Sequence, residues 1–407
     1  MRAIYERCCG LDVHKKTAVA CRLTPDGSQT RTFGTMTDDL MQLRKWLLEA
    51  GVTHVAMEST GVYWKPVFNL LEDHGMELLV VNARHVKAVP GRKTDVKDAE
   101  WLAELLQHGL LKASFIPDRE SRERRELVRY RRTLVEQRAH LVQRIQKLLE
   151  GANIKLGDVA SDVMGVSGRA MLQALADGVD DPAAVAGMAK AALRNKLPEL
   201  ERALTGSVRP HQRFLLRSQF RLLASIEAEI ATLDQEVAER MHPFQVALER
   251  LDEIPGIGRR AAEQILVETG TDMSRFPTAG HFASWARVCP GNNESAGKRQ
   301  HASIGGGNRW LRSALLEAAW TVSHSRKQTF FTARYRRIAA RRGKKRAAIA
   351  TAHSLLIAVY HVLRDGVVFQ DLGPSYFERR NQDAIVRRSL HRLEALGYKV
   401  RIEAMTA

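Results

Sequence analysis

The segment Cys8-Cys9-Gly10-Leu11-Asp12-Val13 begins a series of short apolar stretches that decides the fold of the first 115 residues. Residues 17–23 and 29–33 have the composition of two further strands, and Pro25-Asp26-Gly27 is a turn between them. The three strands together predict a β-meander.

Helices and strands alternate after the meander. Residues 38–50 carry leucines at helical spacing and stop at Gly51, and residues 63–74 form a second predicted helix. Residues 54–57 and 77–81 are predicted as short buried strands. This order predicts an α/β domain with a mixed sheet.

Two acidic residues lie on the predicted strands. Asp12 has apolar neighbours in the first strand, where a carboxylate is costly unless it is paired or coordinated. Glu58 ends the fourth strand, at the carboxyl edge where α/β sheets bind ligands. Taken singly, Asp12 could instead stabilise a neighbouring loop and Glu58 could cap the next helix.

Two more acids lie in Lys93-Thr94-Asp95-Val96-Lys97-Asp98-Ala99-Glu100, where a helical pattern begins. A helix places Asp95 and Asp98 on one face with Cβ atoms about 5–6 Å apart. These like charges repel unless a cation or water screens them, although both could simply be acids favoured by the helix dipole. With Asp12 and Glu58 they could bind Mg²⁺ or Mn²⁺, and two such ions would hold the attacking and leaving oxygens of a phosphodiester.

The composition favours a polyanionic partner. The 407 residues include 63 Lys+Arg against 46 Asp+Glu, which gives a formal charge of +17. Nucleic acid is the first candidate and an anionic membrane surface the second. Because no apolar run of membrane length and no signal peptide is found, we expect a soluble, intracellular protein without a membrane partner. The four cysteines lack CxxC spacing, which predicts reduced thiols and no zinc site.

Two long polar helices are predicted in residues 116–245. Residues 118–150 keep an apolar stripe in a highly charged sequence, and residues 211–241 repeat apolar positions by three, four or seven. Both are predicted as arms of a coiled coil, packed against each other, against a second chain, or both. Short helices are expected in residues 151–210. The seven arginines of residues 118–132 could contact nucleic acid or form a solvated face.

The sequence Ile254-Pro255-Gly256-Ile257-Gly258-Arg259-Arg260 resembles a helix-hairpin-helix motif. In such a motif the backbone N–H groups at a helix start bind phosphate without reading the base sequence. Gly256, Gly258, Arg259 and Arg260 are therefore candidate nucleic-acid contacts. A simple corner between two helices is the alternative.

Ser295 is a candidate nucleophile in a glycine-flanked loop between predicted helices at residues 281–287 and 310–323. Cationic neighbours would stabilise the charge that develops when a serine attacks a phosphodiester. Ser303 and Ser313 are alternatives. The cations that follow, and that could contact nucleic acid, are Lys298, Arg299 and Arg309.

Residues 334–346 carry eight basic residues and no acid. Because no acid is present to form ordinary ion pairs, this run is predicted to contact phosphate. Residues 347–363 are predicted as a core helix, in which His353 and His361 are packed rather than metal ligands.

Several motifs are similar to those of the DEDD transposases of insertion sequences. They are Gly10-Leu11-Asp12-Val13-His14-Lys15-Lys16, Met57-Glu58-Ser59-Thr60-Gly61 and Lys93-Thr94-Asp95-Val96-Lys97-Asp98-Ala99. The helix-hairpin-helix sequence, the segment around Ser295 and Gly307-Asn308-Arg309-Trp310-Leu311-Arg312 resemble the carboxy-terminal transposase domain of the same family. The order of the acids also resembles the ribonuclease-H-like fold in its Holliday-junction-resolvase (RuvC-like) branch.

The resemblance implies an RNA-guided recombinase. A bridge RNA would pair with donor and target DNA, and a serine of the second domain would attack the phosphodiester across from an acidic Mg²⁺ site, in a composite site between subunits. Ala296 stands where the family commonly has glycine, and Gly305-Gly306-Gly307 replaces a more polar run. Carried over by position, the acids are Asp12, Glu58, Asp95 and Asp98, and the serine is Ser295.

We therefore expect a multidomain α/β plus α protein that cuts and rejoins DNA as a transposase. The resemblance also implies a cytoplasmic, nucleoid-associated bacterial protein. Expected partners are donor and target DNA, guide RNA and further copies of the chain, as a dimer or tetramer. The alternatives are a metal-dependent junction nuclease in which water attacks, and a non-catalytic nucleic-acid-binding protein. The expected domains are a ribonuclease-H-like domain (1–115), coiled-coil arms (116–245), a mainly helical serine transposase domain with the helix-hairpin-helix (246–370) and a tail (371–407).

Overall fold

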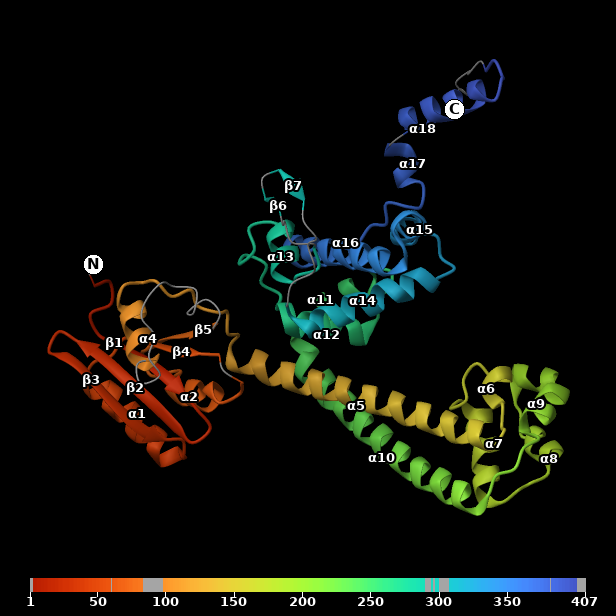
Figure 1. The fold of residues 1–407 in the computed structure, drawn as a ribbon, viewed down its shortest axis with the longest axis horizontal. Coiled ribbons are helices and arrows are strands. Elements are labelled where there is room, and N and C mark those ends of the chain that lie inside the picture. Colours follow the sequence, from red (N-terminus) through yellow and green to blue (C-terminus); the bar gives the residue numbers. More distant parts are fainter. Residues whose placement is uncertain are drawn as a thin grey trace. The chain divides into compact units, whose positions relative to one another are not determined.

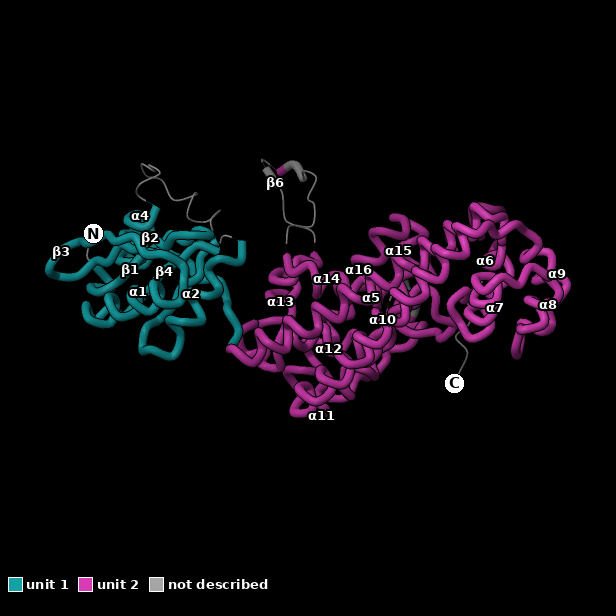
Figure 2. Tube along the Cα trace, turned by 90° about the horizontal axis from the view of Figure 1, so that it is seen from below, with its two compact units in different colours: residues 1–118 teal, residues 119–407 magenta. Residues whose placement is uncertain are grey.

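The computed structural model describes residues 3–59, 61–82, 98–289, 294–295, 297–299, 307–380 and 382–400. The chain divides into two compact units, residues 1–118 and 119–407 (Figure 2). The first unit is α/β and the second is built mainly of helices (Figure 1). This is the predicted fold class, whereas the finer division into four segments stays a prediction.

A five-stranded sheet forms the centre of the first unit. Its strands are β1 (Cys8–Val13), β2 (Thr17–Thr24), β3 (Gly27–Gly34), β4 (His54–Glu58) and β5 (Glu77–Val81). Their order is β3-β2-β1-β4-β5, with β1 to β3 antiparallel and β1, β4 and β5 parallel. The predicted meander and mixed sheet are confirmed, and the carboxyl ends of β1, β4 and β5 meet at one edge.

Alternating side chains of β1 decide which helices cover each face of the sheet. Cys9 and Leu11 are buried against α1 and α2, and Cys8 is buried against α4 on the other face. The helices of this unit are α1 (Thr37–Glu49), α2 (Trp64–Leu71) and α4 (Asp98–Gln107).

Gly10 lets α4 lie directly on β1. A Cβ atom at residue 10 would lie 2.2 Å from the carbonyl oxygen of Ala99 and 2.5 Å from the backbone nitrogen of Ala103. Ile4, upstream of β1, donates its N–H to the carbonyl of Gln107 at the other end of α4 (2.8 Å). Helix α4 therefore runs antiparallel to β1, and its first residue lies toward the carboxyl end of that strand.

The second helix is shorter than the sequence predicts. Residues 63–74 were expected to be helical, but α2 ends at Leu71. Asp73 has a φ of +67°, in the left-handed region, so the helix cannot continue through it.

The cysteines are free thiols, as predicted. Cys8, Cys9 and Cys21 are buried in the sheet, and burial raises the pKa of Cys8 to about 12. A protonated, buried thiol reacts slowly with oxidants and metals.

Two long antiparallel helices, α5 (Arg119–Gly151) and α10 (Pro210–Met241), pack against each other within the second unit (Figure 1). Leu134 of α5 shares a small core with Ile230 and Leu233 of α10. The predicted packing of the two arms against each other is confirmed, while their coiled-coil geometry stays a prediction.

Short helices join the far ends of α5 and α10 and enclose a core of their own. Ile145 of α5 and Leu223 of α10 are buried in it. We call this part the helical tip. Its elements are α6 (Leu156–Val159), α7 (Val166–Asp177), α8 (Pro182–Ala186), the 3₁₀-helix η2 (Ala191–Lys196) and α9 (Leu197–Leu204).

A third core lies at the near ends of α5 and α10, where the chain continues through a bundle of helices. Val128 of α5 and Val237 of α10 belong to it. Its elements are the 3₁₀-helix η3 (His242–Phe244), α11 (Gln245–Asp252), α12 (Arg259–Thr269), α13 (Ala279–Trp285), α14 (Arg309–His324), α15 (Phe330–Arg342) and α16 (Lys344–Asp365). The chain ends in α17 (Tyr376–Arg380) and α18 (Gln382–Ala395).

Helix α16 is the predicted core helix of this bundle. It is long and apolar enough to cross a membrane, but half of its most apolar window is buried inside the protein, as in a core helix. His353 is half-buried, as expected. The prediction of a packed His361 was wrong, because this side chain is exposed and its Nδ1 lies 3.0 Å from Asp365 Oδ2.

Candidate active site and nucleic-acid-binding surfaces

Asp12 and Glu58 occupy equivalent places on neighbouring parallel strands. The register of β1 against β4 pairs Leu11 with Met57, so that the next residue of each strand is an acid. Asp12 is 22% exposed, and its Oδ2 lies 3.1 Å from His14 Nε2. The two acids thus end two adjacent strands at the carboxyl edge of the sheet, where α/β proteins bind their ligands.

Asp98 begins the helix that covers this side of the sheet. Gly10 faces α4 and Ala56 packs against it, and each lies two residues before an acid. Because side chains two apart share a face, Asp12 and Glu58 belong to the side that α4 covers. Since α4 runs antiparallel to β1, Asp98 lies toward the same edge.

The donor set fits a hard cation, because all the side chains are carboxylates. Among the described residues, no three Asp, Glu, His or Cys side chains are close enough to hold a metal ion. Asp95 lies outside the described residues, so its predicted pairing on one helix face with Asp98 stays a prediction.

The predicted helix-hairpin-helix is a tight turn between α11 and α12. Gly256 has a φ of +91°, and a Cβ atom there would lie 2.6 Å from the Ala318 carbonyl oxygen and from Val322 Cγ2 of α14. Gly256 is therefore needed for the turn and for close packing on α14. Gly258 precedes the first residue of α12 and is exposed, so of the two glycines it is the one accessible to a phosphate.

Arg259 and Arg260, predicted to contact phosphate, already have partners within the protein. Arg259 donates to Glu263 and Gln245, both at 2.8 Å, and Arg260 pairs with Asp234. A phosphate would have to compete with these groups.

Ser295 lies in a short hairpin rather than in the predicted loop. The strands β6 (Glu294–Ser295) and β7 (Lys298–Arg299) pair with Ser295 opposite Lys298, and Gly297 between them has a φ of +74°. The backbone thus places Lys298 directly opposite the candidate nucleophile, and Arg299 opposite Glu294.

A buried carboxylate that sequence reasoning missed, Glu268, holds the start of α14. Its side chain is 0% exposed and accepts from Arg129 Nε (2.7 Å) and Nη2 (2.8 Å). Asn308 Nδ2 donates to the same carboxylate (2.6 Å), while Asn308 Oδ1 accepts from the backbone N–H groups of Trp310 and Leu311. The sequence signal was an acid within the apolar run that precedes Thr269.

Arg309, the first residue of α14, is exposed, in keeping with a role in nucleic-acid binding. Its guanidinium carbon lies 4.7 Å from the centroid of the Trp310 ring. This stacking leaves the N–H groups at the edge of the guanidinium plane available to a phosphate.

Most of the described arginine contacts of α5 are internal. Besides Arg129, Arg131 pairs with Asp234 (3.0 Å) and Glu263 (2.8 Å), and Arg132 pairs with Glu317. These arginines join helices of the second unit, so most of this arginine-rich stretch serves neither as a solvated face nor as a free anion-binding surface.

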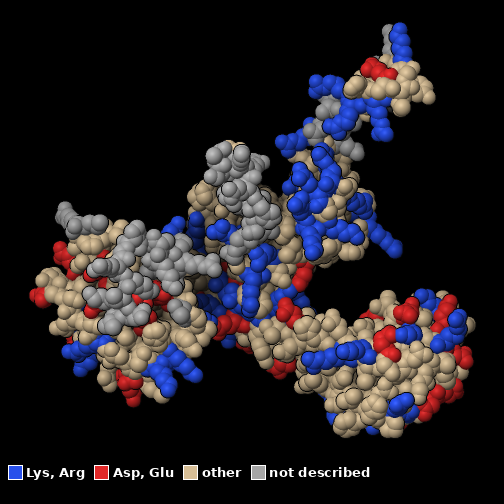
Figure 3. All heavy atoms as spheres, viewed as in Figure 1, with Lys and Arg blue, Asp and Glu red and all other residues tan. Residues whose placement is uncertain are grey.

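The basic residues around Gly343 have different surroundings. They are exposed at the junction of α15 and α16, and in the described part of the chain no carboxylate pairs with them. Figure 3 shows Lys and Arg atoms gathered over α15. We call this set the junction patch: Arg341, Arg342, Lys344, Lys345 and Arg346.

Two family models match the chain. One, a DEDD model for IS110 elements described as "Transposase", matches residues 9–154, and the other, "Transposase IS116/IS110/IS902 family", matches residues 248–336. The first match includes all four candidate acids, and the second includes Ser295.

Several relatives are similar over much of their length. A putative transposase y4pF/y4sB of Sinorhizobium fredii is 27% identical over 80% of this chain and 76% of its own. The pilin gene-inverting protein of Moraxella bovis is 24% identical over 88% of this chain and 96% of its own. With the sheet order and the placement of the acids, these matches show that the chain belongs to the IS110 family of insertion-sequence transposases.

Proposed function

We propose that this transposase cuts and rejoins DNA strands through a phosphodiester bond to Ser295. The carboxylates of Asp12, Glu58, Asp95 and Asp98 would hold the divalent cation that stabilises the leaving oxygen. Guide RNA that pairs with donor and target DNA would supply the choice of sequence. The protein would then bind mainly backbones, as in other guided systems.

The convergence of acids at one sheet edge carries the proposal. Asp12 and Glu58 end adjacent parallel strands on the face that α4 covers, and Asp98 begins α4 at the same end. The described acids are not close enough to hold a metal ion as they stand. Carboxylates brought closer together at this edge would repel one another, and a divalent cation would relieve that repulsion. When bound there, Mg²⁺ would stabilise the oxyanion that leaves phosphorus.

The serine step conserves the bond energy of the backbone. The Ser295 oxygen forms a bond to phosphorus, its hydroxyl proton passes to a base, and the bond from phosphorus to the 3′-oxygen breaks. A 3′-hydroxyl from the exchanged strand reverses these steps and frees the serine. Lys298, directly opposite Ser295 on the paired strand, supports the step, because cations stabilise the charge of the phosphorane.

The relatives support recombination rather than simple cleavage. The Moraxella bovis protein is described as a pilin gene-inverting protein, and inversion requires that strands be rejoined after cutting. A nuclease that uses water would leave the ends open.

The test uses DNA and a transcribed non-coding segment taken from the flanks of this gene. We expect Ser295→Ala and Asp12→Asn each to abolish strand exchange while nucleic-acid binding survives, and Ser303→Ala to recombine normally as the control. Wild-type protein stopped with detergent should carry a covalent DNA adduct that Ser295→Ala lacks. Strand exchange by Ser295→Ala would eliminate the covalent mechanism, and cleavage without an adduct would favour a water-dependent nuclease.

A further inference from the structure

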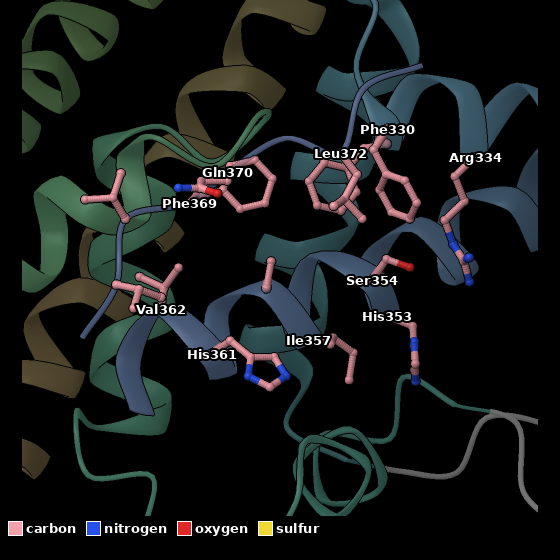
Figure 4. Close-up of a pocket in the computed structure, with 14 residues that line it drawn as sticks. Phe330, Arg334, His353, Ser354, Ile357, His361, Val362, Phe369, Gln370 and Leu372 are labelled. Atoms are coloured by element: carbon pink, nitrogen blue, oxygen red, sulfur yellow. The ribbon is translucent and has the colours of Figure 1, made fainter. Parts of the chain in front are cut away.

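A groove on the C-terminal helices is lined mainly by apolar side chains and has its one arginine at one end. It has a volume of about 600 Å³ and lies between α15, α16 and the segment after α16. Figure 4 shows Arg334, His353 and Ser354 at one end, with Val362 and Phe369 toward the other. The groove is thus shaped for a ligand with a flat or apolar part and a polar group.

Arg334 has no acidic partner in the part of the chain that the structure describes. Its Nε donates to the Ala350 carbonyl (3.3 Å), and burial lowers the pKa of its guanidinium. None of the residues that line the groove is an acid, and no described carboxylate forms an ion pair with Arg334. A half-buried cation without a counter-charge is costly, and an anion in the groove would remove that cost.

His353 is a second side chain of the groove that would interact favourably with an anion. Burial and the neighbouring Arg334 lower the pKa of His353, so the ring is neutral at pH 7. An anion between Arg334 and His353 would offset the part of this pKa shift that comes from repulsion by Arg334.

The surroundings indicate which anion. Arg337 and Arg341 lie three and seven residues after Arg334 on α15, so the three side chains share one face of the helix. This row leads from the groove toward the junction patch. Consecutive phosphates of a nucleic-acid strand would follow such a row, whereas an isolated anion would occupy one position only.

We propose that the groove binds an unpaired nucleotide of a DNA or RNA strand, with its phosphate at Arg334 and His353 and its base in the apolar body. This rests on the proposed function only in that the chain acts on nucleic acid; it uses neither Ser295 nor the four acids. The apolar body would take any base, because stacking and burial are tolerant of sequence.

The test compares two single-stranded oligomers with the same phosphates, an oligo-dT and an abasic oligomer of equal length, by fluorescence anisotropy. Ser354→Phe, which fills the groove, should weaken oligo-dT binding about tenfold and leave the abasic oligomer unchanged. Arg334→Gln should weaken both, and should lower the slope of log affinity against log salt by about 0.7.

Two further variants provide a second test of the groove and a control outside it. Val368→Ser removes an exposed apolar lining residue at little risk to folding and should repeat the base-dependent loss. Arg336→Gln is the control, because Arg336 lies on the same helix but outside the groove and donates to Gln328 (2.7 Å). It should affect both oligomers equally and less than Arg334→Gln. Thermal unfolding confirms that each variant is folded.

Several outcomes would overturn the inference. One is an equal effect of Ser354→Phe and Val368→Ser on both oligomers, and another is no effect on either. Loss of self-association in Ser354→Phe with unchanged oligomer affinity would assign the groove to a protein partner instead. The same measurement with an oligo-U distinguishes RNA from DNA. Of oligo-dT and oligo-U, the one that loses more affinity in Ser354→Phe is the strand that the groove binds.

The outcome is separable from that of the proposed function. If Ser295→Ala recombines, the covalent mechanism fails while the base-dependent loss can still be observed. If strand exchange requires Ser295 but the two oligomers respond alike, only the groove assignment fails.

Discussion

The arginine-rich start of α5 and the basic residues around Gly343 look alike in sequence but differ in their surroundings. Arg129 and Arg131 of α5 pair with Glu268, Asp234 and Glu263, which come from α10 and α12. The junction patch has no such partners among the described residues. A count of positive charges therefore does not identify a binding surface; the acids on the packing partners decide which cations remain available to phosphate.

The largest expected effect is on stability, and it tests the arginines of α5 that pair with acids. Glu268→Ala should destabilise the protein by about 3–5 kcal/mol, because it leaves Arg129 and Asn308 without their buried acceptor. Urea unfolding gives this value. Glu317→Ala, which removes an exposed partner of Arg132, is the control and should cost about 1 kcal/mol or less. Equal losses of stability in the two variants would mean that Glu268 does not hold Arg129 and Asn308 in place.

The next largest effect is on duplex binding, and it tests the junction patch. Replacement of Arg341, Arg342, Lys344 and Lys345 by Gln should weaken duplex binding at least tenfold, and should lower the salt slope by about 0.9 for each phosphate that the patch no longer neutralises. Stability should change by less than about 0.5 kcal/mol, because these side chains form no ion pairs with the described residues.

The matched control removes four exposed cations: Lys190, Arg194 and Arg202 of the helical tip and Arg221 of α10. It changes the net charge by the same amount and should leave the salt slope nearly unchanged. If both quadruple variants lose affinity alike, binding depends on total charge and the junction patch has no special role.

The smallest effect is a pH dependence at Glu227 of α10, which pairs with Arg138 of α5 and Arg169 of α7. Hydrogen bonds from Arg169 and Arg138 hold the pKa of Glu227 below its usual value of 4.5. A carboxyl with a lowered folded-state pKa stabilises the protein above its unfolded pKa, and this stability is lost as the pH falls through the folded value. Glu227→Gln should therefore be less stable by about 1 kcal/mol at pH 7, with a difference that shrinks below pH 4.

Thermal unfolding between pH 3 and pH 7 measures this difference. Glu229→Gln, an exposed neighbour on the same helix, should follow the wild-type curve at every pH. A constant gap for Glu227→Gln would show that the lost stability comes from packing rather than charge.

The first unit was largely predictable because its signals are local. The bounds of β1 and β5 agree with the prediction, since strand periodicity and flanking turns are contained within a few residues. Asp12 and Glu58 could be assigned to strand positions for the same reason. The register that makes them neighbours depends on pairing across more than 40 residues, and only the fold shows it.

The second unit was less predictable because its decisive contacts are distant in sequence. Arg129 meets Glu268 across 139 residues, so no local pattern could show that the arginines of α5 are paired. The extended backbone of Ser295 depends on a partner strand, which its glycine-flanked sequence did not reveal. The groove likewise requires two helices and the segment after them.

The close fit of Gly10 against α4 also bears on motion. Since no side chain separates the strand from the helix, with 2.2 Å from an added Cβ to the Ala99 carbonyl, β1 and the start of α4 cannot slide past each other without a clash. Asp12 and Asp98 are therefore carried by one rigid body. Any rearrangement that brings this edge to a DNA strand must move both acids together, and their mutual spacing is set before the substrate arrives.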